Sequence, residues 1–123
     1  MADKNTILVV DDEASFRNIL GSVLQNAGYK VELASDGDEA IPAVAQKKID
    51  LILLDIQMKR VGGFEVLQHV KEKYPDIKVV MLTGFSEIAN AVKAKSMGAN
   101  AFIGKPYDLH DLLDTIRDVL AEK

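Results

Sequence analysis

The sequence predicts an α/β fold with a five-stranded parallel sheet and helices on both faces. Two observations carry this prediction: short apolar runs alternate with segments of helical periodicity, and three of these runs are continuously apolar. Strands that are buried on both faces show such continuous runs, which is typical of the centre of a parallel sheet. At 123 residues the chain is expected to form a single domain, residues 1–123.

Five apolar segments are predicted to be strands. Ile7–Val10, Leu51–Leu54 and Val79–Leu82 are the continuous runs and are expected in the middle of the sheet. Val31–Ala34 is more alternating and Ala101–Ile103 is short, so these two strands are expected at its margins. Short connections between parallel strands and helices imply right-handed crossovers, and therefore helices on both sheet faces.

Three helices follow from apolar residues spaced three and four positions apart. The pattern over residues 16–24 predicts the first helix, which Gly28 should end. Residues 109–120 repeat the same pattern, and residues 64–74 predict a further helix that Pro75 should stop. Each of these helices has one apolar face to bury against the sheet.

Two further helices have weaker patterns. Asp36 and Glu39 have the spacing of a capping box and predict a helix start, but Pro42 should bend or shorten that helix. The segment Glu87–Met97 is rich in Ala and Lys and has few apolar residues, so we expect a loosely packed helix there.

Composition excludes several classes of function. The formal net charge of −4 and the pI of about 5.1 argue against a surface that binds duplex nucleic acid directly. The absence of cysteine excludes disulfides and thiolate metal sites. The polar start of the chain shows no signal peptide, and no apolar run approaches the roughly 18 residues of a membrane span. A cytoplasmic protein without membrane contact is therefore expected.

Residues that can carry chemistry follow four of the predicted strands. Asp11 and Asp12 follow the first strand, Asp55 the third, Thr83 the fourth and Lys105 the fifth. Because the carboxyl ends of parallel strands meet at one edge of a sheet, these side chains are expected to converge. The sequence thus predicts a single site built from four separate segments.

Three converging carboxylates repel one another and call for a cation. Oxygen ligands without His or Cys suit Mg²⁺, with Mn²⁺ as the alternative, and such an ion suits chemistry at phosphate. Asp55 is then the candidate nucleophile, which would attack phosphorus and form an acyl phosphate. The Lys105 ammonium and the Thr83 hydroxyl suit phosphoryl oxygens.

These motifs together resemble the receiver domain of two-component response regulators, and the resemblance covers essentially the whole chain. It rests on the acidic pair in Val9–Glu13, on Asp55 with Met58, on Thr83 followed by a small residue, and on Lys105–Pro106. The resemblance implies the flavodoxin-like fold of the chemotaxis regulators, with strand order 2-1-3-4-5.

The resemblance also implies a role for individual residues. Asp55 would be the phosphoacceptor, Asp12 a direct Mg²⁺ ligand, Asp11 a ligand acting mostly through water, and the Gln57 backbone carbonyl another ligand. Thr83 and Lys105, already expected at phosphate, would hold the phosphoryl oxygens. The Lys105–Pro106 bond is commonly cis in the family, which would aim the ammonium into the site.

The implied function is a phosphorylation switch rather than a turnover enzyme. A sensor histidine kinase or a phosphotransfer protein would donate the phosphoryl group, and Phe102 would swing inward as Thr83 moves toward the phosphate. The face formed by the fourth helix, the fifth strand and the last helix would then meet a downstream protein, an output domain outside this chain, or a second phosphorylated copy.

One loop departs from the family pattern. Relatives often have Pro four residues after the phosphoacceptor and an acidic residue or Asn before the following glycine, whereas this chain has Lys59–Arg60 and Val61 ahead of Gly62–Gly63. The two glycines predict a more flexible loop, and the two cations add positive charge near the site.

Three other functions remain open at this stage. A phosphatase with an aspartyl nucleophile would need an acidic residue at position 57, where this chain has Gln57. A nucleotide- or flavin-binding module is disfavoured because Gly98–Lys105 has five rather than four residues between its glycines and Pro106 follows in place of Ser or Thr. A phosphorylation-independent adaptor is the third alternative.

Overall fold

Strands and helices alternate along the chain. The computed structural model describes residues 5–56, 58, 62–83, 88–104 and 108–122. Within these residues the elements are, in chain order, β1 (Thr6–Val10), α1 (Ala14–Asn26), β2 (Lys30–Ala34), α2 (Gly37–Gln46), β3 (Leu51–Asp55), α3 (Gly63–Lys73), β4 (Lys78–Thr83), α4 (Ile88–Ser96), β5 (Ala101–Gly104) and α5 (Leu109–Ala121). Every predicted strand and helix has its counterpart in this series.

The strands form one parallel sheet in the order β2-β1-β3-β4-β5. This is the order that the family resemblance implies, and β2 and β5 lie at the two edges as predicted. The central strand β3 is buried along its whole length. The predicted fold class, a doubly wound parallel sheet, is therefore confirmed.

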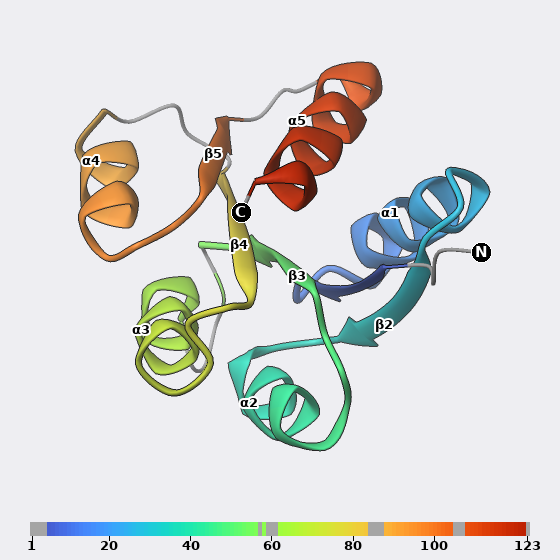
Figure 1. Ribbon diagram of the computed structural model, residues 1–123. Coiled ribbons are helices and arrows are strands. Elements are labelled where there is room, and N and C mark those ends of the chain that lie inside the picture. The colour runs from blue at the N-terminus through green and yellow to red at the C-terminus, as the bar shows by residue number, and fades with distance from the viewer. Residues whose placement is uncertain (1–4, 57, 59–61, 84–87, 105–107, 123) are drawn as a thin grey trace.

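Successive side chains of the central strands pack into two different apolar layers. Leu8 and Ile52 belong to the layer under α2, α3 and α4, whereas Ile7 and Leu51 belong to the layer under α1 and α5. Figure 1 shows these two groups of helices on opposite faces of the sheet. Because both faces are covered, alternate residues of one strand are equally buried, and this explains the continuously apolar runs.

The end of α1 is set by Gly28, as the sequence predicts. Gly28 has a φ of 101°, a conformation that L side chains rarely adopt. Its N–H donates to the carbonyl oxygen of Gln25 (3.0 Å), and the next N–H, of Tyr29, donates to that of Leu24 (3.1 Å). These bonds satisfy carbonyls at the helix end and turn the chain directly into β2.

The start of α2 is a modified capping box. The Asp36 carboxylate accepts a hydrogen bond from the Glu39 N–H (3.1 Å), as the spacing predicts. The Glu39 carboxylate, however, reaches one residue further back and accepts from the N–H (2.6 Å) and the hydroxyl (2.7 Å) of Ser35. These bonds lower the pKa of the Glu39 carboxyl below 4.5, with a smaller contribution from the positive charge of Arg17.

Pro42 does not end α2. The helix continues four residues beyond it, to Gln46. Pro42 is the sixth residue of the helix and is exposed, so the missing N–H lies near the solvated N-terminal part of the helix. The helix therefore accommodates one residue that cannot donate a backbone hydrogen bond.

Gly63 does not act as the flexible residue that the Gly62–Gly63 pair predicts. It is buried and begins α3, and its N–H donates to the carbonyl oxygen of Ile56 (3.2 Å). A Cβ atom at this position would lie 2.5 Å from the backbone oxygen of Asp55 and 2.7 Å from the Cα of Ile56. Gly63 therefore permits close packing of the helix start against the end of β3.

A half-buried lysine joins the end of α3 to the start of β5. The Lys71 ammonium donates to the backbone oxygen of Ile77 and to the Asn100 side-chain oxygen, both at 2.9 Å. The same Asn100 oxygen accepts from the Val79 N–H of β4 at 2.9 Å. Burial, with the positive charge of Lys78, lowers the pKa of Lys71. This network fixes the turn between α4 and β5 to β4.

Within the described residues, none of the helices has the length and apolar character that crossing a membrane requires. The longest helices here, α1 and α5, have 13 residues each. This agrees with the sequence, in which no apolar run of that length occurs.

Replacing Gly63 by Ala is expected to lower the free energy of unfolding by about 1–3 kcal/mol, because the added methyl group meets backbone atoms that cannot rotate away. Urea denaturation of the purified variant measures this loss. The matched control is Gly62→Ala, whose Cβ would come no closer than 3.9 Å to a flexible Glu65 side-chain oxygen. An equal loss in both variants would contradict the close-packing argument.

The carboxylate of Glu39 is expected to stabilise the protein only where it is ionised. Because its pKa is lowered in the folded state, the stabilisation is present above pH 4.5 and is lost as the pH falls through the folded-state pKa. Urea denaturation should therefore show Glu39→Gln as less stable than the wild type at neutral pH, with a difference that shrinks on acidification. Glu72→Gln, which changes an exposed carboxylate held by one 3.3 Å bond from Gln68, is the control and should show a smaller difference. A pH-independent difference for Glu39→Gln would refute the assignment.

Candidate functional site

The first two acidic residues of the site lie directly beyond β1. Asp11 is 2% exposed and Asp12 is half-buried. The Asp11 N–H donates to the carbonyl oxygen of Ala34 (3.2 Å), so the chain is still attached to β2 at this point. The strand pairing thus places Asp11 at the carboxyl edge of the sheet.

Asp55 is the last residue of β3 and is only 6% exposed. It lies opposite Leu82 in the register between β3 and β4, and the next N–H, of Ile56, donates to the Leu82 carbonyl oxygen (2.9 Å). Asp55 is therefore held between two neighbouring strands and beneath the close contact made by Gly63. Its backbone position is set by the sheet itself.

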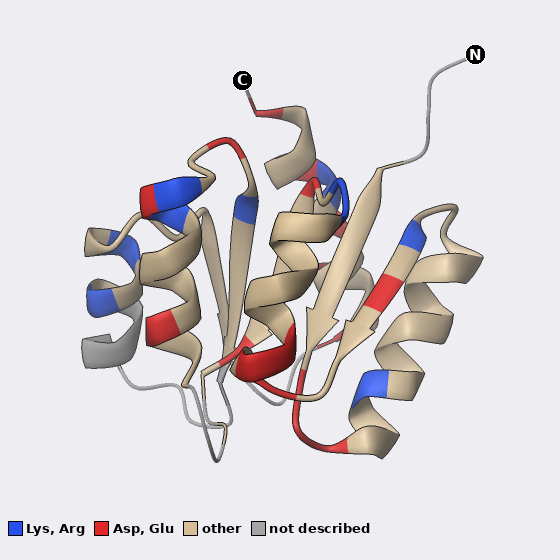
Figure 2. Ribbon diagram, turned by 90° about the horizontal axis from the view of Figure 1, so that it is seen from below, with Lys and Arg blue, Asp and Glu red and all other residues tan. Residues whose placement is uncertain are grey.

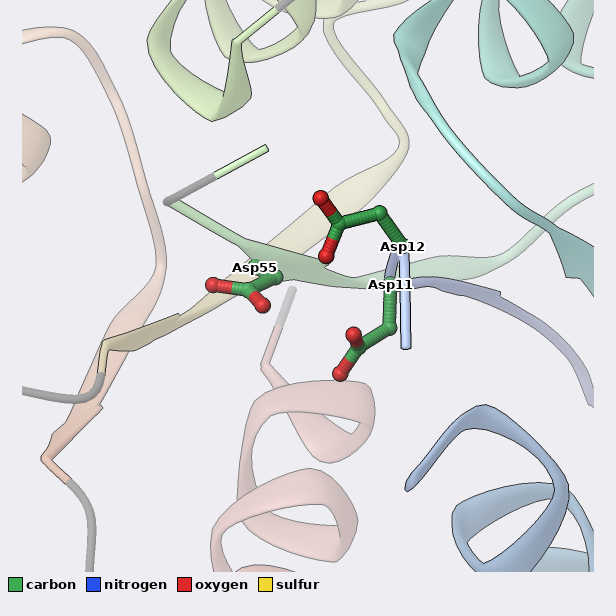
Figure 3. Close-up of side chains that lie close together, drawn as sticks. All are labelled: Asp11, Asp12 and Asp55. Atoms are coloured by element: carbon green, nitrogen blue, oxygen red, sulfur yellow. The ribbon is translucent and has the colours of Figure 1, made fainter. Parts of the chain in front are cut away.

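The three carboxylates converge as the sequence predicts. One oxygen from each of Asp11, Asp12 and Asp55 lies within 4.8 Å of the others. Figure 3 shows the side chains of Asp11 and Asp12 at the end of β1 and that of Asp55 at the end of β3, around a common space. Figure 2 shows Asp and Glu residues in the loops at the carboxyl edge of the sheet.

One oxygen of the cluster is buried with no hydrogen-bond partner among the described residues: Oδ2 of Asp11. The other oxygen, Oδ1, accepts from the Glu13 N–H (2.9 Å). A buried carboxylate oxygen without a partner is unfavourable unless a cation is nearby. Oxygen donors alone, at this separation, are the ligands that Mg²⁺ and Mn²⁺ prefer, so the residues fit the predicted metal.

Helix capping alone does not explain the arrangement of Asp11 and Asp12. The N-cap residue of α1 is Glu13, and its side chain makes no capping hydrogen bond. Asp11 makes a local turn with one oxygen only, and its carboxylate also belongs to the acidic cluster. The pair therefore has an arrangement that capping does not explain.

Thr83 ends β4 and pairs with Gly104 at the end of β5, which brings these strand ends to the same edge as Asp55. Gln57, Lys59–Arg60 and Lys105–Pro106 lie outside the described residues, as does the side chain of Thr83. The structure thus shows the acidic half of the predicted site and the backbone position of the threonine.

Phe102, the predicted switch residue, is in β5. Its side chain is half-buried and packs against the apolar layer under α2, α3 and α4. It also lines a cavity of about 230 Å³ together with Lys95, Ala99, Asn100 and Ala101. An aromatic ring beside such a cavity has room to change its rotamer.

Two residues that contact the site carry no sequence signal that predicts this contact. Gly63 packs against the backbone of Asp55, and Arg17 donates a hydrogen bond from Nη1 to the backbone oxygen of Asp11 (2.7 Å). The glycine pair signalled an unusual backbone, although its cause was interpreted as flexibility. Nothing in the sequence distinguishes Arg17 from an ordinary solvated helix residue.

The fold and the site define a class: a doubly wound α/β domain with a carboxylate cluster at the carboxyl edge of its parallel sheet. Comparison with known proteins makes this specific. Residues 7–117 match the family model of the response regulator receiver domain. The chain belongs to this family, the receiver domains of two-component signalling.

Similar proteins of known sequence are longer than this chain. It is 38% identical to the probable transcriptional regulator ycf27 of Guillardia theta, over 95% of this chain and 46% of that protein. It is 40% identical to the transcriptional regulatory protein ZraR of Klebsiella oxytoca, over 94% of this chain and 26% of that protein. The chain thus spans about half or less of these two relatives.

Two solved structures match the chain along nearly their whole length. The chemotaxis protein CheY4 of Vibrio cholerae has a TM-score of 0.90 and 33% identity, covering 95% of this chain and 99% of that one. The receiver domain of NtrX from Brucella abortus has a TM-score of 0.89 and 34% identity, with the same coverage. Both confirm the fold that the resemblance implied.

Replacing Asp11 by Asn is expected to stabilise the metal-free protein by about 1 kcal/mol, because it removes one charge from a crowded, buried cluster. The same change should reduce the stabilisation that added Mg²⁺ provides. Urea denaturation in EDTA and in MgCl₂ measures both effects. Asp118→Asn, at a side chain that is 74% exposed on α5, is the control and should change neither. Destabilisation of the metal-free Asp11→Asn protein would count against repulsion in the cluster.

Proposed function

We propose that this chain is a phosphorylation-driven signalling domain in which Asp55 accepts a phosphoryl group from a histidine kinase or a phosphotransfer protein. The observation that carries this proposal is the convergence of Asp11, Asp12 and Asp55 within 4.8 Å at the carboxyl edge of the sheet. Membership of the receiver family, in which Mg²⁺-dependent phosphoryl transfer is general, supports the same function. The whole of residues 1–123 would then act as one receiver domain.

The proposed chemistry needs Asp55 as the nucleophile. One of its carboxylate oxygens forms the new bond to phosphorus while the bond from phosphorus to the donor imidazole nitrogen breaks, and the imidazole leaves with that electron pair. The product is an acyl phosphate on Asp55. Because Asp55 is nearly buried and fixed by strand pairing, its carboxylate is held in place for an incoming phosphoryl group.

Asp11 and Asp12 would hold Mg²⁺, or alternatively Mn²⁺, together with Asp55 and the backbone carbonyl of Gln57. Such an ion, when bound, neutralises negative charge on the carboxylates and phosphoryl oxygens. Asp12 is the more exposed of the acidic pair and suits direct coordination, whereas Asp11 is buried and one of its oxygens is already engaged by Glu13. This supports direct ligation of the ion by Asp12 and ligation through water by Asp11.

The response to phosphorylation would begin at Thr83 and Lys105, whose hydroxyl and ammonium groups suit the phosphoryl oxygens. Thr83 pairs with Gly104, the residue before Lys105, so both belong to neighbouring strand ends. A displacement of Thr83 would vacate space that Phe102 can enter from β5. This supports a two-state switch in which phosphorylation changes the population of an inward Phe102.

The output would be read on the face formed by α4, β5 and α5. Two large apolar side chains are exposed on these helices, Val92 (62%) on α4 and Leu109 (41%) on α5. The residues that line the cavity beside Phe102 lie between Val92 and Leu109 in the sequence. A downstream protein, an output domain or a second phosphorylated copy would dock here, in the cytoplasm and without direct contact with nucleic acid or membrane.

A turnover phosphatase is the competing function for the same residues. An aspartyl phosphatase requires a second acid at position 57 to protonate the leaving group, and this chain has Gln57. We therefore propose a phosphoacceptor with self-phosphorylation and self-dephosphorylation chemistry rather than an enzyme acting on an exogenous phosphoester. Release of product from a simple aryl phosphate would favour the phosphatase.

Incubation with acetyl phosphate and Mg²⁺ is expected to add one phosphoryl group to the protein, because the reagent supplies an activated phosphoryl group to the Asp55 carboxylate without a kinase. Intact-mass spectrometry measures the addition. The gain should disappear in EDTA and in the Asp55→Asn variant, and it should persist in the matched variant Asp118→Asn.

A wild-type protein with no gain in mass should be tested for Mg²⁺-dependent binding of beryllofluoride, which detects an acceptor whose acyl phosphate is short-lived. Failure of both experiments would contradict phosphoryl acceptance and favour the phosphorylation-independent adaptor. A gain in mass that survives Asp55→Asn would place the acceptor elsewhere.

A further inference from the structure

Arg17 connects α1 to the backbone of the acidic cluster. It lies in the first turn of the helix, where its own N–H donates to the Glu13 carbonyl oxygen (3.0 Å), and its side chain is half-buried. From there Nη1 donates to the backbone oxygen of Asp11 at 2.7 Å. A charged donor at this distance makes one of the stronger hydrogen bonds of a protein.

This contact completes the set of bonds that hold Asp11. Its N–H donates to Ala34 on β2, its Oδ1 accepts from the Glu13 N–H, and its backbone oxygen accepts from Arg17. The remaining oxygen, Oδ2, is buried and has no partner among the described residues. Within the described part of the chain, Oδ2 is thus the one hydrogen-bonding atom of Asp11 that no hydrogen bond holds.

The backbone oxygen that Arg17 binds belongs to the peptide group between Asp11 and Asp12. A peptide group is planar, so holding its oxygen also fixes the N–H and the Cα of Asp12. One guanidinium contact therefore restrains the orientation of both carboxylates. Asp12 depends on this restraint because it makes no hydrogen bond of its own with the described residues.

We propose that Arg17 is a positioning residue for cation binding: it orients the peptide group that carries the two carboxylates of the metal site. This inference rests on the proposed function, in which Asp11 and Asp12 hold the metal. Arg17 itself does not touch the metal or the phosphoryl group in this proposal. It acts through the backbone, as residues outside the ligand shell of a metal commonly do.

A purely electrostatic role for Arg17 predicts the opposite result. Its positive charge lies at the carboxyl edge of the sheet, since Nη1 is 2.7 Å from the backbone oxygen of Asp11. Acting only through space, such a charge repels a divalent cation, so its removal would strengthen Mg²⁺ binding. Positioning predicts weaker binding after the same removal. The sign of the change therefore separates the two roles.

The test is the dissociation constant of Mg²⁺ for the full chain, measured by isothermal titration calorimetry with MgCl₂ and no phosphodonor. Arg17→Met, which keeps the aliphatic stem but loses the donor, should bind Mg²⁺ about tenfold more weakly than the wild type. Arg17→Lys keeps a charge and a donor and should lie between the two. Arg117→Met, at an exposed arginine in the C-terminal half of α5, makes the same change of net charge and should bind like the wild type.

Each outcome decides a separate point. An unchanged or tighter Mg²⁺ affinity in Arg17→Met, with normal affinity in the wild type, would overturn the positioning role and leave the proposed function intact. A wild-type protein that binds no Mg²⁺ would overturn the metal site and this inference with it. Circular dichroism checks that each variant is folded. Should Arg17→Met fail to fold, Arg17→Lys decides the question, because positioning requires weaker binding there and a charge effect requires none.

Discussion

The repulsion among three carboxylates is the interaction on which the rest of this structure depends. At 4.8 Å and an effective dielectric constant near 20, each pair of charges repels by roughly 3 kcal/mol. The sheet opposes this repulsion because β1 and β3 are paired side by side and are buried on both faces immediately upstream of the charges. Apolar packing in the two layers holds the strand ends in register. A cation, when bound, relieves the strain that the core maintains.

The site depends on backbone contacts as much as on the acidic side chains. Gly63 lets α3 begin against the carbonyl oxygen of Asp55, and Arg17 holds the carbonyl oxygen of Asp11. These contacts come from the two opposite faces of the sheet, since α3 and α1 cover different faces (Figure 1). The backbone of the cluster is therefore contacted from both faces of the sheet: Asp55 by the start of α3 and Asp11 by a side chain of α1. Movement of a strand end would be passed directly to a helix start.

The sequence predicted the features that follow from periodicity and from the rule that parallel strands end at one edge. The five strands, the end of α1 at Gly28 and the convergence of Asp11 with Asp55 are of this kind. It could not predict contacts that depend on tertiary packing between distant segments. Lys71 meets Asn100 across 29 positions, and the close approach at Gly63 depends on the path of β3. The Arg17 bond depends on a side-chain rotamer, which residue type alone does not fix.

The edge strand β2 also affects whether copies of this protein associate with one another at high concentration. An open sheet has unpaired backbone groups at its margin, and these can recruit a strand from another molecule. Here β2 is only five residues long and has Lys30 and Glu32 within it, and Glu32 is further engaged by Lys47 from the end of α2. A docking strand would have to desolvate these charges. The short, charged margin therefore guards against edge-to-edge aggregation, even though Leu33, the residue after Glu32, is exposed.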